Sequence, residues 1–349
     1  MPQPTGQLID GKYQLVEVAG EGGMATVYRA VQKGAAGFQR QVAIKHIKPE
    51  YRALTNYVDR FIEEARVGSE LAHPNIVQVH DFVAQEGSYY LVMEWVEGID
   101  LGHFIRVYQD AGKHVEWALA VAIGIGTLRG LGAAHERRAP NGELAPVIHR
   151  DVTPHNILLG GNGVVKLTDF GLARARDRVA SMTAPGTVKG KLSYLAPEVS
   201  FGKANTPLSD IFHVGSVLWE TLAGERLFDG KNDVEIFKKI RACKVPPIIE
   251  RRPDVPASLV AVLDVALDPD PNNRYNSATA MAHALAQVMK QAVGIDPQSA
   301  LGQAVRDMRA KLRGGDIDVQ FSADIDLSTA DFNVEPIELV NPKKTKPPG

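Results

Sequence analysis

The chain has 349 residues, of which 44% are hydrophobic and 23% charged, and its formal net charge is -2. This composition is typical of a globular protein and leaves room for one large domain or two ordinary ones. The small net charge excludes an electrostatic case for nucleic acid as the principal partner, and a single cysteine, Cys243, excludes an internal disulfide. The first residues do not read as a signal peptide, and no apolar run reaches the roughly 18 residues of a membrane span, so we expect a cytoplasmic chain without a membrane segment.

Residues 13–31 predict a β-hairpin, because their apolar and polar residues alternate on both sides of a glycine-rich turn. The turn consists of Gly20, Glu21, Gly22 and Gly23. Without a Cβ atom, glycine lets backbone N–H groups come close to phosphate oxygens, although any tight hairpin needs glycine as well. The next strand ends in Val42-Ala43-Ile44-Lys45 and adds a lysine to this region.

The stretch from Tyr57 to Leu71 has the apolar spacing of a helix and carries two adjacent acidic residues, Glu63 and Glu64. Glu64 follows Phe61 by three residues and lies nearer the apolar stripe, so we prefer it as the partner of Lys45. Glu63 suits a solvated surface position. A second hairpin turns at residues 86–88, which gives five antiparallel strands and one main helix over residues 12–96.

From residue 97 the pattern becomes mainly helical and continues to about residue 293. Trp117 to His135 predicts a long buried helix, and residues 136–146 predict an exposed loop. A further buried helix begins near Asp210, with Ser209 as candidate N-cap and Gly224 as its end. Residues 294–349 form a separate tail with one helix, Ser299 to Leu312, followed by a flexible segment. The predicted class is α+β.

Residues 147–171 concentrate the chemistry. Asp151, Asn156 and Asp169 carry side-chain oxygens, and the segment between the last two reads as strand, tight turn and strand. This hairpin returns Asp169 to the neighbourhood of the other two. Oxygen ligands suit a hard divalent cation such as Mg²⁺, which takes few protein ligands and binds substrate phosphates as well. Turns also favour Asp and Asn because their side chains hydrogen-bond to the nearby backbone, so none of these residues by itself indicates a metal site.

These motifs resemble those of the protein kinase superfamily. His149-Arg150-Asp151 with Asn156 is similar to the catalytic loop, and Asp169-Phe170-Gly171 to the metal-binding triplet. Ala196-Pro197-Glu198 is similar to the end of the activation segment. The resemblance implies a two-lobed fold, with a small five-stranded N-terminal lobe at 12–96 and a larger helical lobe at 97–293. The loop resembles bacterial, eukaryotic-like (Hanks-type) serine/threonine kinases, particularly those of the myxobacterial type.

The resemblance also implies roles for individual residues. Asp151 would orient the acceptor hydroxyl and take its proton, Lys45 would hold the ATP phosphates and Glu64 would hold Lys45. Asn156 and Asp169 would bind Mg²⁺, or Mn²⁺ in its place. The residues implied to surround the nucleotide, besides the glycine-rich turn, are Val27, Ala43, Met93, Glu94, Val96, Asp100 and Leu158. Asp210 would hold the catalytic loop, and Arg274 would pair with Glu198.

Two positions depart from the family pattern. Serine/threonine kinases usually carry lysine two residues after the catalytic aspartate, where this chain has Thr153. Near the end of the activation segment they usually carry threonine, where this chain has Lys191. Since these two side chains touch in the family, we interpret the pair as exchanged, with Lys191 supplying the ammonium group and Thr153 the hydroxyl. A solvated lysine at 191 is the alternative.

Several arginines surround the hydroxyl residues of the activation segment. Arg174, Arg176 and Arg178 alternate after Gly171, and guanidinium groups bind phosphate through paired hydrogen bonds. The candidate phosphate acceptors are Ser181, Thr183 and Thr187. The alternative is that these arginines form a solvated face.

The predicted function is transfer of the ATP γ-phosphate to Ser or Thr hydroxyls of proteins. We also expect autophosphorylation in the activation segment, for which two copies of the chain could associate. A nucleotide-binding scaffold without activity and a small-molecule kinase of the same fold are the alternatives. The intact Lys45, Asp151 and Asp169 disfavour the first, and the full activation segment disfavours the second.

Overall fold

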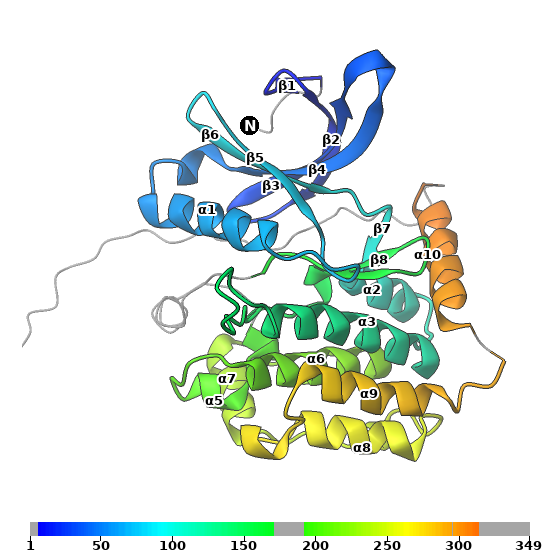
Figure 1. Cartoon of the computed structure of the whole chain (residues 1–349). Coiled ribbons are helices and arrows are strands. Elements are labelled where there is room, and N and C mark those ends of the chain that lie inside the picture. The colour runs from blue at the N-terminus through cyan, green and yellow to red at the C-terminus, as the bar shows by residue number, and fades with distance from the viewer. Residues whose placement is uncertain (1–5, 171–191, 295, 314–349) are drawn as a thin grey trace, which may run out of the picture.

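The computed structural model describes residues 6–170, 192–294 and 296–313. They form two lobes, a sheet with one long helix above and a bundle of helices below (Figure 1). The predicted tail beyond residue 313 and most of the activation segment lie outside the described residues.

The N-terminal lobe is a six-stranded antiparallel sheet in the order β1-β2-β3-β4-β6-β5. Its strands are β1 (Leu8–Ile9), β2 (Tyr13–Glu21), β3 (Ala25–Lys33), β4 (Gln39–Ile47), β5 (Val79–Gln85) and β6 (Ser88–Glu94). The prediction of five strands is therefore wrong by one. The extra strand, β1, has only two residues, too few for a period-two pattern to show in the sequence.

Alternation along the strands separates the two faces of this sheet. Val42 and Ile44 belong to an apolar cluster on one face, whereas Ala43 and Ile47 join α1 (Thr55–Ser69) on the other. Successive side chains of a strand point to opposite faces, so Lys45 extends toward the same side as Ala43 and toward α1. This register sets the direction of the lysine before any charge acts on it.

The C-terminal lobe is built mainly of helices around one apolar core. They are α2 (Leu101–Asp110), α3 (Trp117–His135), α5 (Pro197–Ser200), α6 (Pro207–Ala223), α7 (Asp233–Ala242), α8 (Ala257–Ala266), α9 (Ala278–Met289) and α10 (Pro297–Arg313). A three-stranded sheet of β7 (Gly98–Asp100), β8 (Ile157–Gly160) and β9 (Val165–Leu167) lies between these helices and the upper lobe (Figure 1). This sheet positions the segments that precede and follow the predicted catalytic residues.

Helix α3 runs through the middle of the lower lobe, as Figure 1 shows. Among the described residues it is the one helix long and apolar enough to cross a membrane, and most of it is buried inside this lobe. Gly130 faces the segment after α1, where a Cβ atom would lie 2.7 Å from the Asn75 carbonyl oxygen. A glycine here therefore lets the helix pack closely against this segment of the upper lobe, between α1 and β5.

Helix α6 begins earlier than the sequence indicated. Its N-cap is Thr206, and Ser209 occupies the third helical position of a capping box, so the prediction of Ser209 as N-cap is wrong. The Pro207 ring suits the first helical position and makes the early start possible. Gly224 ends the helix in the left-handed region at φ 76°, as expected.

Helix α10 packs against the side of the molecule where the two lobes join (Figure 1). Leu301, Val305 and Met308 are buried in the core of the lower lobe. Arg306 donates to the Gly161 carbonyl oxygen in the β8–β9 turn, and Arg309 pairs with Glu97, just before β7. The helix predicted in the tail thus belongs to the packed structure.

Candidate active site

Two carboxylates hold the ammonium group of Lys45 between the lobes. Its Nζ lies 2.7 Å from Glu64 Oε1 and 3.1 Å from Asp169 Oδ1. Burial by itself would lower the pKa of Lys45, but the two carboxylates outweigh it and hold this pKa above its ordinary value. Lys45 is therefore charged at neutral pH and ties the upper sheet to the segment after β9. Glu63 instead accepts a hydrogen bond of 2.7 Å from Arg66 Nε.

Asn156 holds the end of the loop that carries Asp151. Its Nδ2 donates to the Asp151 carbonyl oxygen at 2.7 Å and lies 3.3 Å from Asp151 Oδ2. With Nδ2 directed at Asp151, the amide oxygen is the atom of this side chain that can bind a cation. The Asn156 carbonyl oxygen accepts the Thr168 N–H at 3.0 Å, so the segment before Asp169 is attached to the same loop.

His149 connects the two acidic positions. Its Nδ1 accepts the Asp151 N–H at 3.3 Å, and its Nε2 is 3.0 Å from the Thr168 carbonyl oxygen, next to Asp169. Its ring packs against Phe170 with 4.6 Å between centroids. Burial lowers the pKa of His149, so the ring is neutral and can donate with Nε2 while it accepts with Nδ1. One buried imidazole thereby fixes Asp151 and Asp169 on neighbouring segments.

The backbone on both sides of this imidazole is strained, and Asp210 restrains it. Arg150 has φ 68° and Asp169 has φ 56°, in the left-handed region that non-glycine residues rarely adopt. Asp210 Oδ2 and Oδ1 accept the N–H groups of His149 and Arg150, each at 2.8 Å. Asp210 also lies 2.8 Å from His135 Nε2, a contact that the sequence pattern did not suggest.

Asp210 is fully buried at the start of α6. Burial alone would raise its pKa, but the hydrogen bond with His135 and the nearby His213 ring, whose Nδ1 lies 3.6 Å from Asp210 Oδ1, outweigh that effect and hold the pKa well below its usual range. The carboxylate is therefore ionised and can hold the strained loop.

The apolar residues predicted to enclose the nucleotide base lie together. Val27 pairs in register with Lys45, and Ala43 with Met93. One hydrophobic cluster contains Val27, Ala43, Met93, Val96 and Leu158. It draws on both lobes, because Leu158 comes from β8. An apolar slot between two lobes beside a charged lysine is a suitable environment for a base and its phosphates.

Glu94 connects the last strand of the upper sheet to the lower lobe. Its N–H donates to the Gln78 carbonyl oxygen at 2.8 Å, and its carboxylate pairs with Lys166 Nζ at 2.9 Å. The Glu94 N–H and carboxylate therefore both have partners within the protein. The pair with Lys166 was not predicted, because the two residues belong to distant segments.

The glycine-rich turn joins β2 to β3. Gly22 N–H donates to the Ala25 carbonyl oxygen at 2.8 Å, which closes the turn. A Cβ atom at Gly20 would meet nothing within 4 Å, so no packing contact explains glycine at this position. An open backbone that a ligand can approach does explain it. Gly20 and Glu21, predicted to lie in the turn, are instead the last two residues of β2, and the turn begins at Gly22 and includes Gly23.

Of three further predicted site residues, the structure describes two, Asp100 and Thr153, and not the third, Lys191. Asp100 is the N-cap of α2, and its carboxylate contacts His103 and His155. Thr153 is buried just before the catalytic loop residues Pro154–Asn156. Lys191 lies outside the described residues, as do Gly171, Arg174, Arg176, Arg178, Ser181, Thr183 and Thr187. The contact proposed between Thr153 and Lys191 stays a prediction.

Glu198 and Arg274 lie below the site and form a buried ion pair. Arg274 Nη1 and Nη2 donate to the two Glu198 oxygens at 3.0 and 2.8 Å. Ser209 Oγ donates to Glu198 Oε1 at 2.7 Å, which is the role this residue has in place of the cap predicted for it. The pair anchors the end of the activation segment to the lower lobe.

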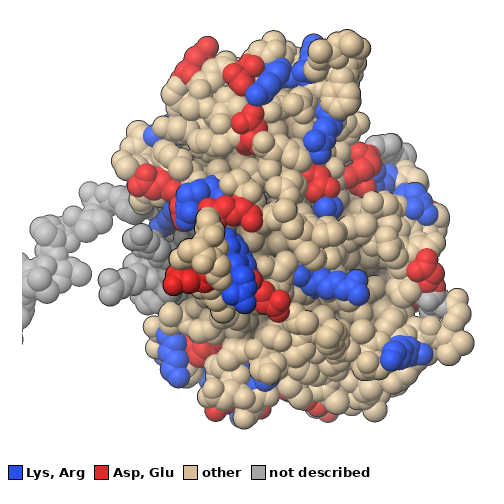
Figure 2. All heavy atoms as spheres, viewed as in Figure 1, with Lys and Arg blue, Asp and Glu red and all other residues tan. Residues whose placement is uncertain are grey.

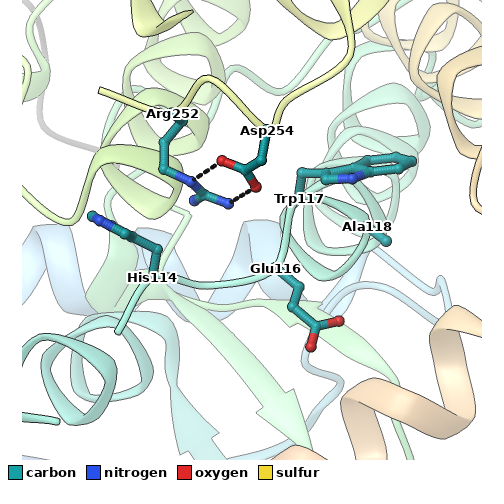
Figure 3. A pocket seen from close by; sticks show the side chains of 6 residues that line it. All are labelled: His114, Glu116, Trp117, Ala118, Arg252 and Asp254. Carbon is teal, nitrogen blue, oxygen red and sulfur yellow. Dashed lines mark hydrogen bonds and ion pairs between the residues drawn. The ribbon is translucent and has the colours of Figure 1, made fainter. Parts of the chain in front are cut away.

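A separate hollow of about 510 Å³ lies on the lower lobe (Figure 3). Its lining residues are His114, Glu116, Trp117, Ala118, Arg252 and Asp254. The guanidinium of Arg252 donates to the carbonyl oxygens of Val115 and Leu222 and to the carboxylate of Asp254. Because these bonds join the loop that carries Arg252 to the segment before α3 and to the last turn of α6, we assign Arg252 a structural role.

The residues of the site fit a triphosphate with a divalent cation. Asn156 and Asp169 offer oxygen ligands next to each other in the fold, and Lys45 offers a buried, charged donor beside them. The arrangement of lysine, helix glutamate, catalytic loop and metal-binding triplet across two lobes defines a protein kinase domain.

The chain belongs to the protein kinase family: residues 13–286 match the protein kinase domain. The resemblance to Hanks-type bacterial kinases and the predicted two-lobed fold are thereby confirmed. The family uses ATP with a divalent metal ion.

Among curated relatives, the tyrosine-protein kinase MasK of Myxococcus xanthus is 39% identical over 275 residues, 79% of this chain and 42% of MasK. The serine/threonine-protein kinase PrkC of Bacillus subtilis is 36% identical over 276 residues, 79% of this chain and 40% of PrkC. The chain thus spans less than half the length of these two relatives. The crystal structure of the Mycobacterium tuberculosis PknI kinase domain is similar with a TM-score of 0.60 and 26% identity, covering 82% of this chain and 100% of that one.

Proposed function

We propose that this protein transfers the γ-phosphate of ATP to serine or threonine hydroxyls of protein substrates. The observation that supports the proposal is the set of polar contacts in the site. Lys45 pairs with both Glu64 and Asp169, and Asn156 donates a hydrogen bond to Asp151. PrkC, a serine/threonine kinase by name, supports the choice of hydroxyl, whereas MasK is named a tyrosine kinase. The loop with Pro154 after Thr153 resembles that of serine/threonine kinases, since tyrosine kinases usually carry a different loop there.

Each residue has a role in the proposed reaction. Bound ATP and Mg²⁺, or Mn²⁺ in its place, supply the phosphoryl group and neutralise its oxygens. Asn156 and Asp169 would hold the cation, and Lys45, held by Glu64, would orient the phosphates. Asp151 would accept the hydrogen bond of the substrate hydroxyl and take its proton. Gly20 to Gly23 would cover the phosphates, and the Val27, Ala43, Met93, Val96 and Leu158 cluster would enclose the base.

We propose two further features of the reaction. Lys191 and Thr153 act as an exchanged pair, and Arg150 with the arginines after Gly171 binds a phosphate on Ser181, Thr183 or Thr187. Autophosphorylation of this segment would require two copies of the chain to associate. The cytoplasm, where ATP is available, is the compartment that this chemistry needs. Acidic and basic side chains alternate on the face in Figure 2 without a large patch of one sign, which gives no support for nucleic acid as a partner.

The experiment is transfer of label from γ-labelled ATP to a generic basic protein, compared between the natural chain and Asp151→Asn. Label on serine or threonine that Asp151→Asn abolishes is the expected result. Nucleotide binding without transfer to any protein would leave the scaffold alternative, and transfer only to small hydroxyl compounds would leave the small-molecule alternative. Label found only on tyrosine would overturn the proposed specificity. Mass spectrometry of the same protein after incubation with ATP tests for phosphate between residues 171 and 198.

A further inference from the structure

A cluster of two histidines and one aspartate lies beside the catalytic loop. Asp100 ends β7, His103 is in the first turn of α2, and His155 is in the loop segment Pro154–Asn156. One ligand atom from each of the three, an imidazole nitrogen of each histidine and a carboxylate oxygen, lies within 4.8 Å of the others. Asp100 Oδ1 is 2.9 Å from His155 Nδ1, and Asp100 Oδ2 contacts His103 Nδ1. Two segments 52 residues apart in sequence, at 103 and 155, thus converge on one carboxylate.

The local structure fixes this cluster. Asp100 caps α2 by accepting the His103 N–H at 3.1 Å, so its carboxylate has little freedom to turn away. Gly102 makes room for the third member, because a Cβ atom at this position would lie 2.4 Å from His155 Cε1. The His155 ring approaches α2 only because residue 102 has no side chain.

Exposure differs across the cluster in a way that leaves one side open. The side chains of Asp100 and His103 are 13% and 9% exposed, whereas that of His155 is 54% exposed. A cation could therefore enter from solvent past His155 and meet two ligands that are already in place. Three protein ligands with an open position are common in zinc sites that are not purely structural.

The kind of ligand selects the ion. Imidazole nitrogen suits Zn²⁺, Co²⁺ and Ni²⁺, whereas Mg²⁺ prefers carboxylate, amide and water oxygens. The predicted magnesium ligands, Asn156 and Asp169, offer only oxygen. We propose that Asp100, His103 and His155 form a binding site for a transition-metal ion, Zn²⁺ by ligand chemistry, separate from the magnesium site. The proposal does not depend on kinase activity.

Bound metal would have a direct structural consequence. It would join the segment Pro154–Asn156 to the first turn of α2 through bonds shorter and less easily broken than the present hydrogen bonds. Since Asn156 directly follows His155, occupancy would restrict a predicted magnesium ligand.

The test is titration of the full chain with Co²⁺ in excess Mg²⁺, read by visible absorption. We expect one Co²⁺ to bind per chain with ligand-field bands, and Zn²⁺ to displace it. His155→Gln, a change at an exposed ring, should weaken binding at least about tenfold. His283→Gln alters an exposed histidine on α9 and should change nothing. Absence of bands in the natural chain, or equal binding by His155→Gln, would overturn the proposal, as would displacement of Co²⁺ by Mg²⁺.

A second measurement guards against misfolded variants. Zn²⁺ should raise the thermal unfolding temperature of the natural chain and of His283→Gln but not of His155→Gln. His103→Gln, at a buried position, should lose the same response even where its own unfolding temperature is lower. A rise of equal size in all four proteins would place the zinc elsewhere and refute the assignment.

Discussion

Replacing Arg274 by methionine tests the buried ion pair with Glu198. The Arg274 side chain is fully buried and that of Glu198 is 5% exposed, and two hydrogen bonds of 3.0 and 2.8 Å join them. Arg274 also donates to the Asp268 and Leu208 carbonyl oxygens. Methionine fills part of the volume but leaves the Glu198 carboxylate buried without its counter-charge. Breaking one side of a buried pair costs about 3–5 kcal/mol, a large share of the roughly 5–15 kcal/mol that stabilises a typical protein.

The assay is equilibrium urea unfolding followed by tryptophan fluorescence and circular dichroism, whose agreement shows whether one transition suffices. Arg29→Met is the matched control, because Arg29 pairs with Glu17 at 2.7 Å on the exposed surface of the upper sheet. An exposed pair contributes about 0.2–1 kcal/mol. The double variant Arg274→Met/Glu198→Gln should be less destabilised than the sum of its single changes, since no buried charge remains. Equal losses for Arg274→Met and Arg29→Met would refute this reasoning.

Lowering the pH should reduce the difference in the free energy of unfolding between the natural chain and Arg274→Met. Burial favours a raised pKa for Glu198, but hydrogen bonds from Arg274 outweigh it and hold the pKa below its ordinary 4.5. The stability that this group contributes is therefore present above pH 4.5 and is lost as the pH falls through the lowered pKa. Without Arg274 the carboxyl takes up a proton more readily, so the variant loses less on acidification.

Three further predictions concern activity, pH and packing. Glu64→Gln removes the nearest carboxylate from Lys45 and should lower kcat/KM for ATP about 100-fold, the scale expected when a catalytic group is misplaced by about 1 Å. Glu63→Gln should leave kcat/KM unchanged. Steady-state kinetics of both variants test this prediction. Burial, with the nearby Arg52, lowers the pKa of His46 from its ordinary 6.5 to about 4. The unfolded chain therefore binds a proton at this residue before the folded chain does. As the pH falls from 6.5 to 4, the natural chain should lose stability by on the order of 2 kcal/mol after screening. Urea unfolding at several pH values should show a flatter slope for His46→Gln, and parallel slopes would contradict the assignment. Gly130→Ala places a methyl group against a backbone carbonyl oxygen and should cost about 1–3 kcal/mol in the same assay, and an unchanged midpoint would mean that α3 can shift without cost.

Motifs with fixed spacing could be read from the sequence because their geometry is local. The hairpin between Asn156 and Asp169 returns the chain over a short distance, and the alternation around Lys45 sets which way its side chain points. The choice of Glu64 over Glu63 followed from helical periodicity alone, and the structure places Glu64 against Lys45.

The features that could not be predicted from the sequence depend on contacts between distant segments or on elements too short to show a pattern. His135 and Lys166 contact Asp210 and Glu94 only because the helices and sheets pack as they do. The two residues of β1 carry no periodicity. The helix that contains Asp210 starts at Pro207, with Thr206 as its N-cap, because proline suits the first helical position. The position of α10 likewise depends on a core formed by other elements.

The packing of α10 has a practical consequence for work on this protein. The match to the kinase family ends at residue 286, but the apolar side chains of Leu301, Val305 and Met308 cover part of the lower core. A shortened protein that stops at the family boundary would expose that apolar surface and would lose the pair between Arg309 and Glu97, so we expect it to aggregate. We therefore expect a stable shortened protein to need the chain at least through Arg309.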